Sequence, residues 1–339
     1  MLITRVVLLF LSINIFIQPV VTAQSNLFDD VFSVEQTIIL QGTEEFPLQA
    51  PGDSYITGER IYLTDFQGNR VAVFDTTGAL LKAVGRDGEG PGEFRMPLSI
   101  RPGQDGMLYV NERGNLRIQV LDESLSPAGI AAVGVQGDQL LPIFHEGEQH
   151  LIVIGLQRCG NARCLARLYD VEGNRVREIA PLNHTPVIST WKGAVHDNLL
   201  HTVNIYEGIV QRFDLEGNLH QTLRLSSPSA RYIRAEEDPS LRPGTEADFR
   251  GLFQQPRSSI RGIFVHDGRI FVQMQNANRQ DTSVEFFLDV YDVEAGNLLM
   301  HGVETPGVLE AVTDRFYFVE ENHTEDVGQL TIRAAQFAR

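Results

Sequence analysis

A repeat of one pattern constrains the fold of this chain more than any other sequence feature. In each copy, polar or turn-forming residues precede a run of strand-forming residues. The six copies begin at Gly58, Asp105, Glu146, Asp197, Asp267 and Asp314. Successive copies start 41 to 51 residues apart, except for a 70-residue interval between the fourth and fifth. Because β-branched and aromatic residues fill these runs, each copy is expected to contain β-strands.

A second recurring element predicts the turns between those strands. An aromatic residue or Leu is followed by Asp, and usually by Gly three residues later, as in Phe74-Asp75-Thr76-Thr77-Gly78. The Asp side chain can cap such a turn through the nearby backbone, and Gly accepts the positive φ that the turn requires. Four strands in each of six copies at this period predict an all-β fold, a six-bladed β-propeller.

The two ends of the chain are expected to complete one blade together. The sixth copy, from Val308 to about Gln336, has room for only three strands. The segment Gln36–Gln41 is a strand-forming run that can supply the fourth, outermost strand and remove the open sheet edges. We therefore predict a single propeller domain over residues 34–339, with an insertion at 226–259 that accounts for the long interval.

Residues 85–122 resemble the NHL-repeat family of six-bladed propellers. The resemblance rests on the glycine-rich run Gly85–Phe94, on Pro97, and on the segments Asp105–Asn111 and Asn115–Asp122. The whole chain also resembles exported bacterial proteins called 6-bladed beta-propeller proteins. The glycine-rich run leads into a strand rather than a helix, so we interpret it as a connector between blades and not as a phosphate-binding loop.

The first 23 residues are typical of a cleavable signal peptide. Arg5 precedes the apolar run Val6–Ile17, and Val21-Thr22-Ala23 places small residues at a cleavage site. The mature protein is expected to be periplasmic or secreted, and the alternative is an uncleaved anchor. No later segment has the roughly 18 consecutive apolar residues of a membrane span.

The net charge disfavours some classes of partner, and the cysteine content predicts a disulfide. The formal net charge of −16 disfavours nucleic acid and anionic lipid, whose binding depends on Lys and Arg. Cys159 and Cys164 are the two cysteines, and an oxidising compartment favours a disulfide between them. A metal half-site is the alternative, but a second cysteine pair that would complete a tetrahedral set is missing.

The long connections are expected on one face of the propeller, where a rigid scaffold commonly presents a binding surface. They are Leu156–Arg163, Ser226–Ser259, Asn276–Thr282 and Glu320–Val327. The candidate binding residues lie in the longest of them, and they are Arg234, Glu236, Phe249 and Phe253. The leading hypothesis is a non-catalytic scaffold without a cofactor that binds a protein, peptide or glycan.

Three histidines support an alternative hypothesis. His145, His196 and His266 occupy the same repeat position in the third, fourth and fifth copies, at the end of the expected innermost strand. Imidazoles around a channel could hold one divalent metal ion that activates water, as in a lyase, hydrolase or lactonase. The structural interpretation of the same position is a polar residue that opens a turn.

Overall fold

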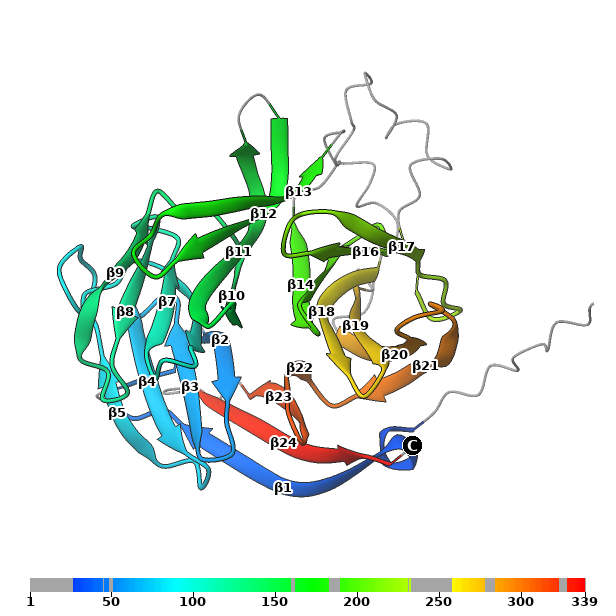
Figure 1. Cartoon of the computed structure of the whole chain (residues 1–339). Coiled ribbons are helices and arrows are strands. Elements are labelled where there is room, and N and C mark those ends of the chain that lie inside the picture. The colour runs from blue at the N-terminus through cyan, green and yellow to red at the C-terminus, as the bar shows by residue number, and fades with distance from the viewer. Residues whose placement is uncertain are drawn as a thin grey trace, which may run out of the picture.

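The computed structural model describes residues 27–44, 46–48, 51–159, 162–182, 190–230, 232, 258–277, 284–322 and 328–338. Over these residues the chain forms six four-stranded antiparallel sheets, arranged as blades around a central axis (Figure 1). The fold is a six-bladed β-propeller, as the repeat predicted. A single short helix, α1 (Phe28–Val31), occurs in the described part of the chain. None of the helical residues described there forms a segment long and apolar enough to cross a membrane.

The strands follow the same inner-to-outer order in the first five blades. Blade 1 contains β2 (Pro51–Ile56), β3 (Arg60–Asp65), β4 (Arg70–Asp75) and β5 (Leu80–Val84). Blade 2 contains β6 (Pro97–Pro102), β7 (Leu108–Glu112), β8 (Arg117–Leu121) and β9 (Pro127–Val133). Blade 3 contains β10 (Gln139–His145), β11 (Glu148–Cys159), β12 (Ala162–Asp170) and β13 (Arg175–Leu182).

The remaining blades complete the ring. Blade 4 contains β14 (Trp191–His196), β15 (Leu199–Asn204), β16 (Ile209–Asp214) and β17 (Leu219–Arg224). Blade 5 contains β18 (Ser258–His266), β19 (Arg269–Ala277), β20 (Val284–Asp292) and β21 (Leu298–Thr305). Blade 6 contains β22 (Val308–Val312), β23 (Phe316–Asn322), β24 (Gln329–Phe337) and, as its outer strand, β1 (Phe32–Gln41).

The N-terminal strand closes the ring, as predicted. β1 pairs with β24 from Phe32 opposite Phe337 to Gln41 opposite Gln329, and the two strands lie side by side in Figure 1. The strand begins earlier than the predicted Gln36, because the residues before it also pack. The rings of Phe28 and Phe32 lie 5.1 Å apart, and each contacts Phe318 at the same centroid distance.

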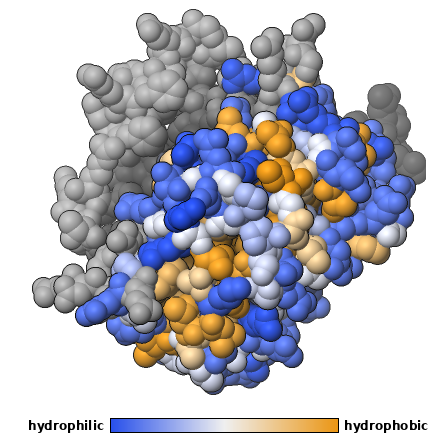
Figure 2. Space-filling model, turned by 90° about the vertical axis from the view of Figure 1, so that its left-hand side faces the viewer, coloured by the Kyte–Doolittle hydropathy of each residue, from blue (hydrophilic) through white to orange (hydrophobic). Residues whose placement is uncertain are grey.

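The hydrophobic core is divided among the contacts between neighbouring blades. Ile56 and Leu63 of blade 1 pack in one cluster with Tyr317 and Ile332 of blade 6. The other neighbouring blades share equivalent clusters. The outer strands expose some apolar side chains, such as Leu81 on β5. Figure 2 shows apolar patches on this side of the molecule, bordered by hydrophilic residues.

A buried polar network holds the glycine-rich connector between blades 1 and 2. The Arg117 guanidinium donates to a carboxylate oxygen of Glu112 at 2.6 Å and to the backbone carbonyl oxygens of Glu89, Gly90 and Glu93. The Gln119 amide donates to Glu112 and to the carbonyl oxygen of Glu93. The side chains of Arg117 and Glu112 are 7% and 0% exposed. The run 85–94 is therefore a structural connector, and Arg117 and Gln119 of blade 2 fix it to that blade.

Removing Arg117 is expected to destabilise the protein strongly. In an Arg117→Met variant the buried Glu112 carboxylate loses its counter-charge, which typically costs about 3–5 kcal/mol. Urea unfolding can be followed by the fluorescence of Trp191, the one tryptophan of the chain, which is 3% exposed. Arg315→Met, which removes a half-exposed pair with Glu35, is the matched control and should cost at most about 1 kcal/mol. Equal losses in the two variants would contradict the role assigned to Arg117.

A buried histidine makes the stability of blade 4 sensitive to acid. His201 is 1% exposed, and burial, with a smaller contribution from the Arg212 guanidinium, lowers its pKa from 6.5 to about 4. The folded protein therefore holds His201 neutral at pH values where the unfolded chain would protonate it. Its contribution to stability is complete above pH 6.5 and is lost as the pH falls toward 4.

This linkage predicts a pH-dependent loss of unfolding free energy. The shift from 6.5 to about 4 corresponds to about 3 kcal/mol between neutral and acid pH. Between pH 8 and pH 4, the unfolding free energy of a His201→Leu variant should therefore decrease by about 3 kcal/mol less than that of the wild type. His220→Leu removes a half-exposed histidine and should keep the wild-type slope. Parallel profiles for wild type and His201→Leu would rule out this linkage.

Candidate functional site

A cavity of about 650 Å³ lies on the propeller axis. Its walls come from the innermost strand of every blade, namely β2, β6, β10, β14, β18 and β22. Its volume lies within the usual range for sites that bind small organic ligands. The charged side chains in its wall are Asp53, Arg101, Arg113, Asp138, Lys192, Arg261 and Glu310.

β-bulges in the innermost strands shape this wall. In four blades the register of the first strand shifts by one residue, at Gly52, Leu98, Arg261 and Glu310. All four residues line the cavity. A bulge leaves one residue unpaired and redirects its side chain. In blades 5 and 6 the residues at the bulges are Arg261 and Glu310, which contribute a guanidinium and a carboxylate to the cavity lining.

Asp53 and Arg101 form an ion pair across blades 1 and 2. The guanidinium of Arg101 donates from Nη2 to Oδ1 of Asp53 at 3.1 Å and from Nη1 to Oδ2. It also lies over the ring of Tyr55, 5.4 Å from the centroid. The two charged side chains are only 12% and 13% exposed. They satisfy each other and form a rigid, electrically neutral part of the wall.

Glu310 is in a different electrostatic situation. Burial raises its pKa to about 7, with a further increase from the Asp53 carboxylate, while Arg101, Lys192 and Arg261 oppose the shift. The carboxyl group of Glu310 therefore titrates closer to neutral pH than an ordinary glutamate does. A group that titrates in this range inside a cavity is typical of functional sites, although structural networks produce it as well.

Apolar residues form part of the remaining wall. The apolar lining residues include Tyr55, Leu141, Ile263, Phe264, Val308 and Val312. Gln139 adds no free amide, because its side chain exchanges two hydrogen bonds with the backbone of Gly193, at 2.8 and 3.0 Å. The cavity therefore combines apolar residues with several charged ones, which suits an amphiphilic ligand.

The three histidines of the metal hypothesis end the innermost strands β10, β14 and β18, as predicted. Each one has a different neighbour. The ring of His145 lies 6.1 Å from that of His150, His196 Nε2 lies 3.3 Å from an Asp197 carboxylate oxygen, and His266 packs against Phe316. Across the described ranges, three His, Cys, Asp or Glu side chains nowhere gather into a group that could hold a metal ion.

The predicted binding residues of the long insertion, which are Arg234, Glu236, Phe249 and Phe253, lie outside the described residues. The sequence analysis did not select the cavity residues. A signal for them was available, because blades 4 and 5 both place a basic residue and glycine before a Val-His pair. The two copies are Lys192-Gly193-Ala194-Val195-His196 and Arg261-Gly262-Ile263-Phe264-Val265-His266.

Comparisons with known proteins agree with this architecture. A family model described as 6-bladed beta-propeller matches residues 15–112. The human NHL repeat-containing protein 3 is 36% identical over 103 residues, and its mouse counterpart is 34% identical over 105 residues. These matches cover 28% and 29% of this chain, and the chain spans only about three tenths of the length of either relative. The chain is a six-bladed β-propeller whose first blades are similar to NHL repeats.

Solved structures with a similar fold align with most of the described propeller. A Bacteroides fragilis protein described as exported superposes with a TM-score of 0.66 at 11% identity, covering 92% of this chain and 96% of its own. A Bacteroides vulgatus protein gives a TM-score of 0.62 at 10% identity, over 90% of this chain and 97% of its own. The virginiamycin B lyase of Staphylococcus aureus gives a TM-score of 0.50 at 10% identity, over 89% of this chain and 99% of its own. At these identities the likeness concerns the fold alone.

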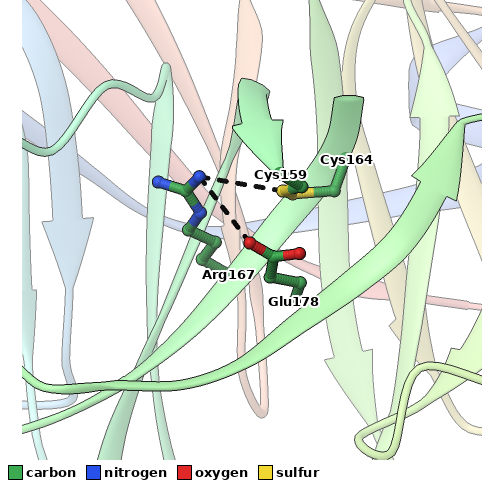
Figure 3. Close-up of a disulfide and its surroundings, with 4 residues drawn as sticks. All are labelled: Cys159, Cys164, Arg167 and Glu178. Carbon is green, nitrogen blue, oxygen red and sulfur yellow. Dashed lines mark hydrogen bonds and ion pairs between the residues drawn. A yellow bond between two sulfur atoms is a disulfide. The ribbon is translucent and has the colours of Figure 1, made fainter. Parts of the chain in front are cut away.

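The predicted disulfide joins the ends of β11 and β12 in blade 3 (Figure 3). The Cα atoms of Cys159 and Cys164 lie 5.8 Å apart. Arg167 points toward the pair, with its Nη2 3.7 Å from Cys159 Sγ and 4.0 Å from a carboxylate oxygen of Glu178. The disulfide lies on a hairpin rather than in the cavity wall, so its role is to stabilise blade 3.

Removing the disulfide should cost little stability. Because it closes a short loop, a Cys159→Ser/Cys164→Ser variant is expected to lose about 2 kcal/mol of unfolding free energy. Urea titrations of the oxidised wild type and of the double variant measure the difference. Dithiothreitol should lower the stability of the wild type to that of the variant and leave the variant unchanged. A variant as stable as the oxidised wild type would show that the disulfide contributes nothing.

Proposed function

We propose that this chain is an exported, non-catalytic binding protein whose ligand occupies the central cavity. The ligand is a small molecule or the exposed end of a peptide, protein or glycan. The observation that carries this proposal is the cavity of about 650 Å³, to which the innermost strands of all six blades contribute. A site built on strands is rigid, so little ordering is required of it when a ligand binds.

Export is supported by three observations. The N-terminal segment is typical of a signal peptide, the cysteines form a disulfide, and one structure of the same fold belongs to a protein described as exported. Disulfides persist mainly in oxidising compartments. The excess of acidic residues also argues against nucleic acid as the ligand.

The long-loop face, predicted from the sequence, stays compatible with this proposal. The connections between blades and those between second and third strands are expected to surround one mouth of the cavity. They could add contacts to a large ligand, whereas the cavity would hold the part that enters the axis. The metal-dependent alternative stays a prediction, and elemental mass spectrometry on mature protein without a tag would test it.

The proposal is tested by filling the cavity. Leu98 lies at a bulge, lines the cavity and belongs to none of the buried clusters, so Leu98→Trp should block the site without disturbing the core. A thermal-shift screen of peptides, oligosaccharides, organic acids and amines should identify compounds that stabilise the wild type. Leu98→Trp should lose these shifts, and Leu81→Trp, which changes an exposed leucine of β5, should keep them.

Two results would overturn the proposal. One is a set of hits that bind Leu98→Trp as well as the wild type, since these would bind outside the cavity. The other is a screen in which no class of compound stabilises the wild type. Far-ultraviolet circular dichroism of each variant confirms that the blades are intact before binding is compared.

A further inference from the structure

Lys192, Arg261 and Glu310 line the cavity without a direct partner, in contrast to the Asp53–Arg101 pair. Lys192 comes from blade 4, Arg261 from blade 5 and Glu310 from blade 6. Within the part of the chain that the structure describes, none of the three side chains makes a direct hydrogen bond or ion pair, but the charges of Lys192 and Arg261 act on Glu310. Lys192 and Glu310 are half-buried and Arg261 is exposed, so all three side chains can reach a ligand in the cavity.

The backbone around these residues positions them. Each is followed by a small buried residue, and these are Gly193, Gly262 and Ala311. At Gly193 the space for a side chain is absent, because an added Cβ would lie 2.4 Å from Ile154 Cδ1 and 2.9 Å from the His201 carbonyl oxygen. At Arg261 and Glu310 the bulges interrupt the ladder. The strand can therefore pack closely against its neighbours while the preceding long side chain lines the cavity.

The charge balance of the wall indicates the sign of the ligand. Four cationic side chains line the cavity, which are Arg101, Arg113, Lys192 and Arg261. Three carboxylates oppose them, which are Asp53, Asp138 and Glu310. The wall thus has one excess positive charge when Glu310 is ionised and two when it is protonated, although the whole chain is strongly acidic. Such a wall complements a single negative charge.

We propose that the cavity binds an organic monoanion, with a carboxylate held by Lys192 and Arg261 and an apolar body against Phe264, Val308 and Val312. The inference rests on the proposed binding function and specifies its ligand class. The planar guanidinium of Arg261 can donate two parallel hydrogen bonds to a carboxylate, and the ammonium of Lys192 adds a point charge. The neighbouring apolar side chains favour a ligand with a hydrocarbon or aromatic part.

Glu310 makes this binding dependent on pH. The charged groups around it are Asp53, Arg101, Lys192 and Arg261, and Arg113 and Asp138 complete the cavity wall. An ionised Glu310 competes with the ligand carboxylate for the two cations, whereas a protonated Glu310 does not. Since the pKa of Glu310 is raised to about 7, binding of a carboxylate that stays ionised should strengthen as the pH falls from 8 to 6. One linked proton gives a change of up to about tenfold over this range.

The test uses probes that share a chain and differ in charge. Isothermal titration calorimetry on the mature full-length protein at pH 6 compares octanoate with octylamine. Octanoate is expected to bind at least tenfold more tightly. Lys192→Met and Arg261→Met should each weaken octanoate binding by about tenfold or more, because each removes a charge-assisted contact. Arg175→Met removes an exposed cation of β13 and is the matched control, with an expected affinity equal to that of the wild type.

A second measurement isolates Glu310. Glu310→Gln keeps the size of the side chain but cannot ionise, so octanoate should bind this variant equally well at pH 6 and pH 8. At pH 8 its affinity should exceed that of the wild type by up to about tenfold. An unchanged pH dependence in Glu310→Gln would overturn the role of this residue.

The outcomes separate this inference from the proposed function. Octylamine binding as tightly as octanoate, or octanoate binding that survives both Lys192→Met and Arg261→Met, overturns the monoanion. If Leu98→Trp abolishes the binding of that ligand, the cavity is the binding site, and only the proposed ligand class is wrong. A titration with inorganic phosphate at the same pH tests whether the apolar part of the ligand matters. A site for any small oxyanion would bind phosphate as well as octanoate, whereas a site for the whole amphiphile would prefer octanoate. Phosphate as tight as octanoate would contradict the apolar part of the proposal.

Discussion

The pairing of β1 with β24 is the interaction on which the rest of the structure depends. It joins residues from the two ends of the chain along nine matched positions, from Phe32 opposite Phe337 to Gln41 opposite Gln329. Without it blade 6 would lack its outer strand, and the ring would keep an unpaired sheet edge. Phe28 and Phe32 reinforce the pairing by packing on Phe318, so the closure is both hydrogen-bonded and apolar. Residues of β1 and β24 also contribute to the apolar clusters that blade 6 shares with blades 1 and 5.

Ring closure also produces the cavity. An innermost strand has no further strand to pair with on the side of the axis, so six strand edges face a common space. Bulges at Gly52, Leu98, Arg261 and Glu310 interrupt the ladders there and add unpaired residues to the wall. The same geometry that stabilises a closed ring therefore supplies a concave surface with both charged and apolar residues. The charged residues in it differ: Asp53 and Arg101 satisfy each other, whereas Lys192, Arg261 and Glu310 make no direct ion pair in the described part of the chain.

The buried polar groups outside the cavity have a different role. Arg117 and Glu112 fix the glycine-rich connector between blades 1 and 2, and His201 is held neutral inside blade 4. Their burial makes them important for stability rather than for binding. This distinction explains why the NHL-like residues of the first blades do not themselves mark a ligand site. In this chain the similarity to NHL repeats reports on how the blades are joined.

Local sequence was sufficient for the blades, and it was not sufficient for the site. Turn residues such as Asp75 and Gly78, alternating with strand-forming runs, act within a few residues of one another, so the repeat predicted the blades and the missing strand. The disulfide was predicted separately, from the two cysteines and the expected oxidising compartment. The position of the three histidines at strand ends also followed from the repeat, but their separate surroundings did not. Lys192, Arg261 and Glu310 lie in three different blades, and only the closed ring brings them into one cavity. The reason is physical: the charge on Glu310 depends on burial and on residues of four other blades, and no local pattern contains that information.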